Sequence, residues 1–247
     1  MKGGADGHGC FPSGKHYPGI AHLLEVLVAG LAEEFPGDTP LDELTIVGLD
    51  TETTGREASD RIVEIACVRW RGGVELGRTA FLVNPECPIT EGARAVHGID
   101  DATVAGEPPI AARVPELLEA LRGAVPLAYN AEFDRGVLTR DLERAGASAV
   151  HAPPALRSGV EWLDPLTWAR ELQRNERSRA LGDVCARLGI ELGQAHRAAD
   201  DCVAALRVFD ALRADERVPR TYAAFVREQR RLAQRFEAER KTWRNRG

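Results

Sequence analysis

The most constraining feature of this sequence is a series of three consecutive strand-like segments. Residues 44–49 form an apolar run with β-branched side chains, which is typical of a buried strand. Residues 62–70 and 74–83 predict two more strands, and the Gly72-Gly73 pair between them favours a hairpin. Because neighbouring strands without an intervening helix pair in opposite directions, we expect three antiparallel strands at the beginning of a sheet.

The segments that follow have helical spacing and enclose a fourth strand. The apolar pattern predicts a strand at residues 125–129 and helices at residues 114–121, 132–144, 165–173, 181–188 and 198–212. Pro115 is expected in the first turn of its helix, where proline is tolerated, and the Pro- and Gly-containing residues 84–109 are expected to form a loop. Strands separated by helices pair in parallel, so the chain predicts an α/β fold with a mixed β-sheet flanked by helices.

The two ends of the chain predict extensions on a central domain of residues 41–212. Residues 19–35 have apolar side chains at helical spacing, so residues 1–40 predict an N-terminal extension with one helix. Residues 213–247 contain eleven Arg or Lys and five acidic residues, and they predict a basic tail with one long helix at residues 222–240. The tail carries +6 and the whole chain −6, so the remaining residues carry −12. A body this rich in carboxylates fits a site for divalent cations.

Composition restricts the class of protein. Hydrophobic residues make up 44% of the 247 residues and charged residues 28%, as in globular proteins with a core. No apolar stretch approaches the roughly 20 residues of a membrane span, and the N-terminus lacks the pattern of a signal peptide. The five cysteines include no C-x-x-C pair, which disfavours a disulfide framework or a zinc site. We therefore expect a cytoplasmic protein without a membrane partner.

A pair of carboxylates comes directly after the first strand. Asp50 and Glu52 stand two residues apart in the sequence Asp-Thr-Glu-Thr-Thr-Gly, so an extended backbone places both side chains on one face. Two carboxylates this close raise each other's pKa unless cations compensate, and their hard oxygen atoms suit Mg²⁺ or Mn²⁺. Gly55 lets the backbone turn and approach a ligand. Taken alone, the pattern is equally typical of solvated acids at a strand end.

Two more acidic motifs begin predicted helices. Residues 130–134 (Asn-Ala-Glu-Phe-Asp) follow the fourth strand, and residues 196–201 (His-Arg-Ala-Ala-Asp-Asp) precede a later helix. On one helix, His196 and Asp201 would be about 140° apart, so His196 belongs to the preceding loop if both serve one site. Helical geometry alone favours Asp200 as the neighbour of the histidine. Each motif alone is also typical of acids at a helix N-terminus or of a surface histidine.

Together, the three motifs resemble those of the DEDD exonucleases of the histidine subtype, over about residues 44–212. That family includes the proofreading epsilon subunit of bacterial replicative DNA polymerase, ribonuclease T and oligoribonuclease. Its third motif is H-x4-D, which selects Asp201 over Asp200 as the last acid. Residues 83–85 (Val-Asn-Pro) and 95–99 (Ala-Val-His-Gly-Ile) are similar to the proofreading branch. Tyr129 departs from that branch, because many of its members have histidine there.

The resemblance implies a ribonuclease H-like fold and a catalytic role for each motif. Four carboxylates, Asp50, Glu52, Asp134 and Asp201, would hold two divalent cations, Mg²⁺ or Mn²⁺. His196 would take a proton from the attacking water as general base, since the ordinary pKa of histidine, about 6.5, is near neutral pH. The implied reaction is the hydrolysis of phosphodiester bonds at the 3′ end of single-stranded DNA, with release of nucleoside monophosphates.

The resemblance also implies a group of residues that bind the terminal nucleotide. They are Thr53, Thr54, Gly55, His97, Asn130 and Phe133. The residue types leave alternatives for three of them. His97 is equally typical of a histidine that holds a loop, Phe133 is more typical of a core position, and Asn130 is also expected as a helix N-cap.

The partners that the resemblance implies are DNA 3′ ends and a DNA polymerase subunit, in proofreading or repair. The first alternative is an RNA-processing 3′→5′ exoribonuclease, which would use the same chemistry on another substrate. The second alternative is a domain without catalytic activity that binds nucleic acid or a polymerase. The complete set of acids argues against a pure binding module, because such a module has no use for clustered, mutually repelling carboxylates.

Overall fold

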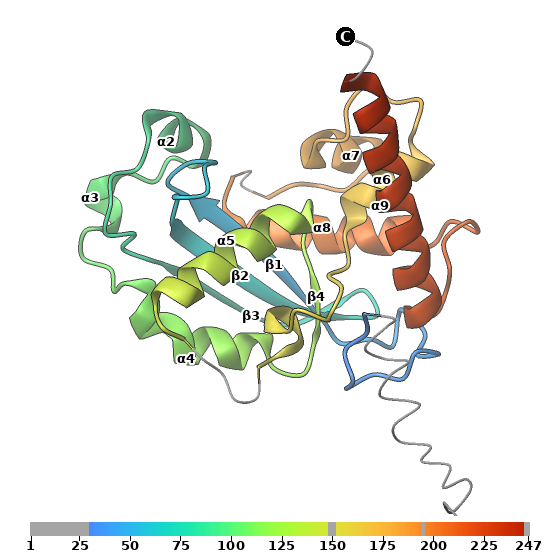
Figure 1. Cartoon of the computed structure of the whole chain (residues 1–247), viewed down its shortest axis with the longest axis horizontal. Helices are drawn as coiled ribbons and strands as arrows, with labels where there is room; N and C mark the ends of the chain where they lie inside the picture. The colour runs from blue at the N-terminus through green and yellow to red at the C-terminus, as the bar shows by residue number, and fades with distance from the viewer. Residues whose placement is uncertain (1–29, 148–151, 194–195, 245–247) are drawn as a thin grey trace, which may run out of the picture.

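The structure is a computed structural model and describes residues 30–147, 152–193 and 196–244 (Figure 1). Its centre is a four-stranded sheet in the order β3-β2-β1-β4. The strands are β1 (Ile46–Thr53), β2 (Ile62–Arg71), β3 (Val74–Leu82) and β4 (Val125–Leu127). β2 is antiparallel to both β1 and β3, whereas β4 is parallel to β1. The predicted mixed sheet is therefore confirmed, including the strand that follows the first helices.

Helices cover both faces of the sheet. They are α2 (Glu91–His97), α3 (Asp101–Val104), α4 (Ile110–Leu121), α5 (Ala131–Arg144), α6 (Pro165–Leu172), α7 (Leu181–Leu188), α8 (Ala198–Leu212) and α9 (Tyr222–Arg244). A short 3-10 helix, η1, spans Pro154–Leu156. α4 and α5 lie on one face of the sheet and α8 on the other (Figure 1). None of the helices in the described ranges is long and apolar enough to cross a membrane.

The side chains of β1 alternate between the two faces of the sheet and contribute to the hydrophobic core on each face. Ile46 packs in the cluster that contains α8, and Val47 packs in the cluster that contains α4 and α5. Gly48 allows the close approach of α8, because a Cβ atom there would lie 2.7 Å from Cys202 Sγ and 2.8 Å from Leu206 Cδ1. The absence of a side chain at this position thus brings the first turn of α8 close to the end of β1.

The predicted tail helix is present, and its first half belongs to the core. Tyr222, Phe225 and Val226 are buried in the cluster that includes α6 and α8. The Tyr222 hydroxyl accepts a hydrogen bond from Ala32 N at 2.9 Å, and the ring of Phe225 lies 4.9 Å from that of Trp168. α9 is therefore a packed element of the fold rather than a helix surrounded by solvent.

The expected loop at residues 84–109 is wrong, because it contains α2 and α3. Both helices are short and depend on their caps rather than on an apolar periodicity. Ala93 N donates to the hydroxyl of Thr90 at 3.2 Å, and Thr103 N donates to the carboxylate of Asp100 at 2.8 Å. Gly98 then ends α2 in the left-handed conformation, with φ of 73°.

Three other boundaries differ from the prediction. α4 begins at Ile110, so Pro115 lies inside the helix rather than in its first turn, on the exposed side. β4 ends at Leu127, two residues before the predicted end, since the chain turns toward α5. Residues 30–35 form turns rather than the end of the predicted N-terminal helix, and residues 19–29 lie outside the described residues.

Candidate active site

Three carboxylates converge at the end of β1, beside the start of α8. Asp50 and Glu52 share one face of β1, as the extended backbone requires, and Asp201 lies in the first turn of α8. One oxygen atom from each of these side chains lies within 4.8 Å of the others. Hard oxygen donors at this spacing fit a divalent cation such as Mg²⁺ or Mn²⁺.

The fourth carboxylate, Asp134, connects α5 to the same strand. Its Oδ1 atom accepts a hydrogen bond from Thr51 N at 3.0 Å and another from the Thr51 hydroxyl at 2.7 Å. Only 3% of Asp134 is exposed. It lies outside the group of three whose oxygen atoms are within 4.8 Å, yet its charge raises the pKa of Asp50. Asp134 therefore borders the carboxylate cluster while one of its oxygens holds β1.

The electrostatics of the site indicate that its crowded carboxylates need positive charge nearby. Burial raises the pKa of Glu52 to about 8, and the nearby carboxylates of Asp201 and Glu64 raise it further. Burial also raises the pKa of Asp134 to about 7, although its hydrogen bonds from Thr51 act in the opposite direction. The pKa of Asp50 is raised well above its usual value by burial and then by its neighbours. Divalent cations would compensate this repulsion, so the residues fit a metal site.

His196 lies on the loop before α8. Helical geometry requires this position if His196 serves the same site as Asp201. Its backbone N donates to Asp201 Oδ2 at 3.0 Å, and its side chain is exposed. The residue has a φ of 63°, in the left-handed region that residues other than glycine rarely adopt. The backbone bond to Asp201 holds this turn and places the imidazole beside the carboxylates.

Glu64 is a site residue that the sequence analysis missed. It lies on β2 directly opposite Glu52, and only 5% of it is exposed. Its carboxylate accepts hydrogen bonds from Arg197 Nη2 at 2.6 Å, Arg197 Nε at 3.3 Å and Ala198 N at 3.1 Å. It thus fixes the start of α8 against the sheet. The available signal was a single acid inside the apolar run of residues 62–68, because a buried charge requires partners.

Asp164 is a second missed residue and holds the start of α5. Its carboxylate accepts from Leu166 N at 2.9 Å, which caps α6, and from Asn130 N at 3.0 Å. Asn130 occupies the N-cap position of α5 with a φ of 71°, but its side chain makes no capping hydrogen bond. The expected N-cap position of Asn130 is therefore confirmed, and its side chain is left for other contacts.

The turn after β1 is held by its own side chains. The hydroxyl of Thr54 donates to Asp60 Oδ1 at 2.9 Å, and the hydroxyl of Thr53 donates to the carbonyl of Gly55. His97 is buried; its Nδ1 accepts from the backbone N of Ile99, so its Nε2 carries the proton and donates to the carbonyl of Thr53 at 3.1 Å. Burial lowers the pKa of His97, which favours this neutral form.

Two aromatic residues flank the second motif. Phe133 is half-buried and packs against the cluster that contains α4 and α5. The hydroxyl of Tyr129, where many proofreading exonucleases have histidine, donates to the carbonyl of Arg179 at 2.6 Å. The structure thus places the expected site residues on β1 and the turn after it, on α2, at the start of α5, on the loop before α8 and in the first turn of α8 (Figure 1).

The fold and the clustered carboxylates define a ribonuclease H-like domain with a metal site of the kind that nucleases use. A comparison with protein families agrees, because the model of the Exonuclease family RNase_T matches residues 47–209. This match covers more than half of the chain, so the protein belongs to the exonuclease family.

Relatives with curated names are named after DNA polymerase III. The chain is 42% identical over 125 residues to the "DNA polymerase III subunit epsilon-like protein" of Rhodobacter capsulatus. This match covers 49% of this chain and 18% of that protein. It is 31% identical over 207 residues to "DNA polymerase III PolC-type" of Streptococcus thermophilus. That match covers 80% of this chain and 14% of the polymerase. The chain therefore spans less than a fifth of the length of these relatives.

Solved structures with a similar fold are exonucleases. Exonuclease X in complex with 5′ overhanging duplex DNA has a TM-score of 0.55 and 25% identity, over 72% of this chain and 97% of that one. The zinc-bound complex of E. coli ExoI with single-stranded DNA has a TM-score of 0.60 over 70% of this chain and 41% of that one. At 22% identity, the second likeness supports the ribonuclease H-like fold alone.

Proposed function

We propose that this protein is a 3′→5′ exonuclease that removes nucleoside monophosphates from the 3′ end of single-stranded DNA. The observation that carries the proposal is the convergence of Asp50, Glu52 and Asp201 within 4.8 Å, in a chain that belongs to the exonuclease family. Residues 41–212 would form the catalytic domain, between extensions at residues 1–40 and 213–247.

The four acids would hold two divalent cations, Mg²⁺ or Mn²⁺. Asp50, Glu52 and Asp201 have oxygen atoms close enough to share one cation, and Asp134 borders them with one oxygen already bonded to Thr51. When bound, such cations supply a water of lowered pKa and neutralise charge on the phosphate and the leaving oxygen. The raised pKa values of these carboxylates support the assignment, because perturbed acids cluster at functional sites.

His196 would act as the general base. Its ring is exposed beside Asp201 and can reach a water at the carboxylates, while its backbone bond to Asp201 fixes the turn that carries it. A positioned base contributes about 10²–10⁴ in rate. In this role the imidazole would accept the proton of the attacking water while the water oxygen bonds to phosphorus. The bond from phosphorus to the leaving 3′-oxygen would break, and that oxygen would take a proton from solvent.

The turn after β1 would receive the terminal nucleotide. Because the hydroxyls of Thr53 and Thr54 are already bonded within the turn, we infer that Thr53, Thr54 and Gly55 bind mainly through their backbone. His97 would support this turn through Thr53, and Asn130 would contact the substrate with its free side chain. A contact of Phe133 with a base would use the part of its ring that the core leaves exposed.

A DNA polymerase is the partner that we propose, in proofreading or repair. The support is that the curated relatives are named as an epsilon-like subunit and as PolC-type polymerases. The chain spans only a small part of those proteins, so this assignment depends on a pull-down with replicative polymerase subunits.

The proposed reaction is tested by digesting 5′-labelled single-stranded DNA and RNA with Mg²⁺, with Mn²⁺ and with EDTA. We expect a descending ladder on DNA that requires metal and disappears in Asp50→Ala. Glu143→Ala is the matched control, because this acid is exposed at the opposite end of α5 and should leave the ladder unchanged. Cleavage of RNA alone would identify an exoribonuclease. Intact substrates with folded protein and metal would refute an enzymatic role.

A further inference from the structure

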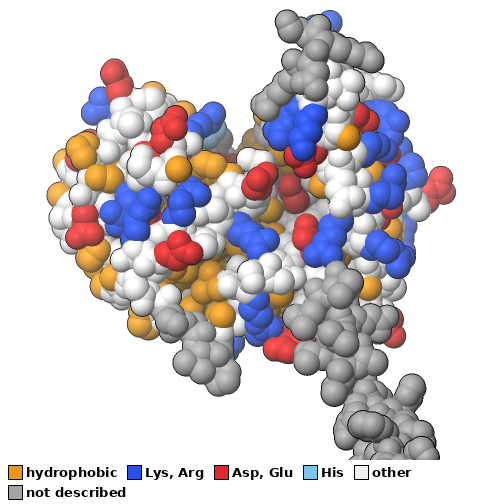
Figure 2. Space-filling view, in the orientation of Figure 1, with side chains coloured by type: hydrophobic (Ala, Val, Ile, Leu, Met, Phe, Trp, Pro, Cys, Tyr) orange, Lys and Arg blue, Asp and Glu red, His pale blue; other side chains and the backbone are white. Residues whose placement is uncertain are grey.

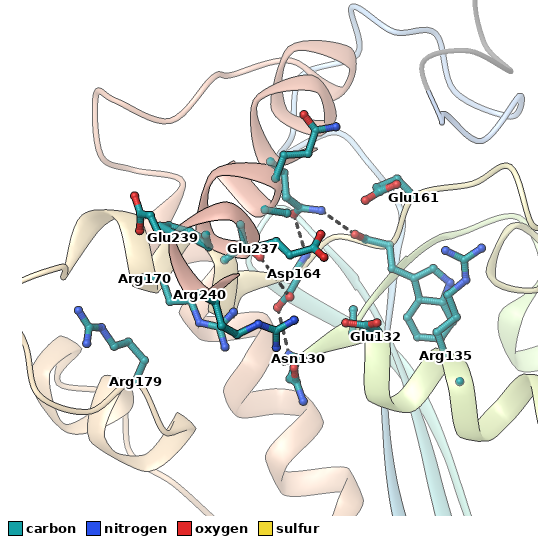
Figure 3. A pocket seen from close by; sticks show the side chains of 18 of the residues that line it. Asn130, Glu132, Arg135, Glu161, Asp164, Arg170, Arg179, Glu237, Glu239 and Arg240 are labelled. Carbon is teal, nitrogen blue, oxygen red and sulfur yellow. Dashed lines mark hydrogen bonds between the residues drawn. The ribbon is translucent and has the colours of Figure 1, made fainter. Parts of the chain in front are cut away.

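A separate cleft adjoins the candidate active site. It has a volume of about 1150 Å³ and lies between the start of α5, the helix α6 and the second half of α9 (Figure 3). Asn130, Ala131 and Glu132 line it, one turn of α5 before Asp134. Figure 2 shows the same face hollowed between the part that carries α2 and α5 and the part that carries α6 and α9. A chain leaving the active site past Asn130 would enter this cleft.

Arginine side chains from three elements and a loop line the cleft. They are Arg135 and Arg140 of α5, Arg170 of α6, Arg174 and Arg179 of the loop after α6, and Arg240 of α9. Among the described residues, only Arg174 of these six forms an ion pair, with Glu171. The buried Nε atoms of Arg140 and Arg179 have no hydrogen-bond partner at all. The other five guanidinium groups have no carboxylate partner in the described part of the chain. Arg135 Nη2 donates to the carbonyl of Ser158 and Arg179 Nη2 to that of Arg174, so these two offer their remaining N–H groups to an anion in the cleft.

Most of the acidic residues that line the cleft form ion pairs with basic residues that do not line it. Glu161 pairs with Arg230 at 3.1 Å, Glu237 with Lys241 at 2.8 Å and Glu239 with Arg235 at 3.6 Å, and none of these three bases lines the cleft. The carboxylate of Asp164 accepts bonds from the backbone N atoms of Asn130 and Leu166. Among the described residues, the exposed Glu132 is the one lining acid with neither an ion pair nor the backbone hydrogen bonds that Asp164 accepts.

The composition of the cleft identifies the class of ligand. Guanidinium groups bind phosphate oxygens through paired hydrogen bonds, and several at intervals along a groove suit a phosphate chain. Phe236 adds an aromatic side chain to the same wall, although the guanidinium of Arg235 lies over its ring at 4.9 Å. In Figure 3, Arg170, Arg179 and Arg240 lie on the side opposite Arg135, so a strand between them would meet arginines on both sides.

We propose that this arginine-lined cleft binds the sugar-phosphate backbone of a single DNA strand, upstream of the 3′ end that enters the active site. The inference rests on the proposed exonuclease function and adds a path for the substrate. Arg240 lies beyond residues 47–209, which the family model matches, so part of this path belongs to the chain's own C-terminal helix.

The test compares Arg170→Gln/Arg240→Gln with the matched control Arg227→Gln. All three arginines are exposed, and Arg227 lies on α9 outside the cleft without an ion pair among the described side chains. The probe is fluorescent oligothymidylate of 15 nucleotides, with anisotropy measured in EDTA at several salt concentrations. Each lost phosphate contact should lower the slope of log affinity against log salt by about 0.7, which is roughly fivefold in affinity at 0.1 M salt.

We expect the double variant to bind the 15-mer roughly 25-fold more weakly and with a slope smaller by about 1.4, whereas Arg227→Gln binds like wild type. Metal-dependent hydrolysis of a dinucleotide, which is too short to reach the cleft, should be the same in all three proteins. Equal affinity and slope in the double variant and the control would overturn the path. The path would also be overturned if the double variant lost binding to polyglutamate but retained binding to DNA, because the cleft would then be a protein-docking site.

The two proposals fail in different ways. If wild type binds the 15-mer through the arginines but cleaves no DNA with metal, the exonuclease proposal fails and the cleft remains. If hydrolysis is normal and the arginine substitutions change no binding, only the path fails.

Discussion

Glu64→Gln tests whether the start of α8 must be held against the sheet for catalysis. The substitution keeps the shape of the side chain but removes its charge and turns one accepting oxygen into a donor. In the native structure, Oε1 accepts from Arg197 Nη2, and Oε2 accepts from Arg197 Nε and from Ala198 N. An amide cannot accept on both sides, so it must give up either the bond from Arg197 Nη2 or the two bonds from Arg197 Nε and Ala198 N.

The cost follows from these three bonds. A hydrogen bond to a charged group contributes about 1.5–3 kcal/mol, and the exposure of Arg197 reduces the value of its bonds by solvent screening. We therefore expect the free energy of unfolding with Mg²⁺ to fall by about 1–2 kcal/mol. Because Glu64 positions the turn that carries Asp201, catalysis or metal affinity should fall by about 10–100-fold, as when an outer partner of a metal ligand is lost.

The assay is single-turnover hydrolysis of a 5′-labelled oligomer over a range of Mg²⁺ concentrations. We expect the Mg²⁺ midpoint to rise and the maximal rate to fall in Glu64→Gln, with little change in the affinity for DNA. Glu75→Gln is the matched control, since Glu75 forms a paired interaction with Arg78 on β3. A folded Glu64→Gln protein with the midpoint and rate of wild type would refute the positioning role.

Three other perturbations have defined outcomes. Burial and neighbouring carboxylates raise the pKa of Asp50, so in EDTA its ionised form destabilises the fold as pH rises above the ordinary carboxyl range. Asp50→Asn should therefore melt at a higher temperature than wild type at pH 8 in EDTA, with a smaller difference at pH 5; a lower melting temperature at pH 8 would contradict the repulsion. Gly48→Ala should lower the free energy of unfolding in urea by about 1–3 kcal/mol through overpacking, whereas Gly92→Ala, with open space at its Cβ, should not. Tyr222→Phe should cost about 1–3 kcal/mol in the same assay, because Ala32 N loses its acceptor; an unchanged midpoint would show that this bond contributes nothing.

The sequence predicted those parts of the fold that depend on local pattern. β2 and β3 were predicted within one residue of their ends, since strand-like residue types and a Gly-Gly hairpin between two such segments are local signals. The shared face of Asp50 and Glu52 followed from strand geometry for the same reason. α2 was missed because it has only seven residues and depends on a cap at Thr90 and a left-handed Gly98.

The rest of the site depends on contacts between distant residues. Glu64 and Arg197 are 133 residues apart, and no periodicity in the sequence relates them. Tyr222 and Ala32 are 190 residues apart, so a basic and polar tail gave no sign that it would enter the core. His196 was placed on its loop only by assuming that it shares a site with Asp201.

The two halves of α9 differ in the substitutions that the fold can accept. Phe225 and Val226 can change only in ways that the packing around Trp168 allows, whereas Gln234 and Arg240 are exposed and can change in charge without affecting the core. Substitutions in the second half would alter the cleft while leaving the carboxylates of β1 and α8 untouched. The binding that we propose for the cleft could therefore change by substitution in this half of α9 without any change in the proposed catalytic acids.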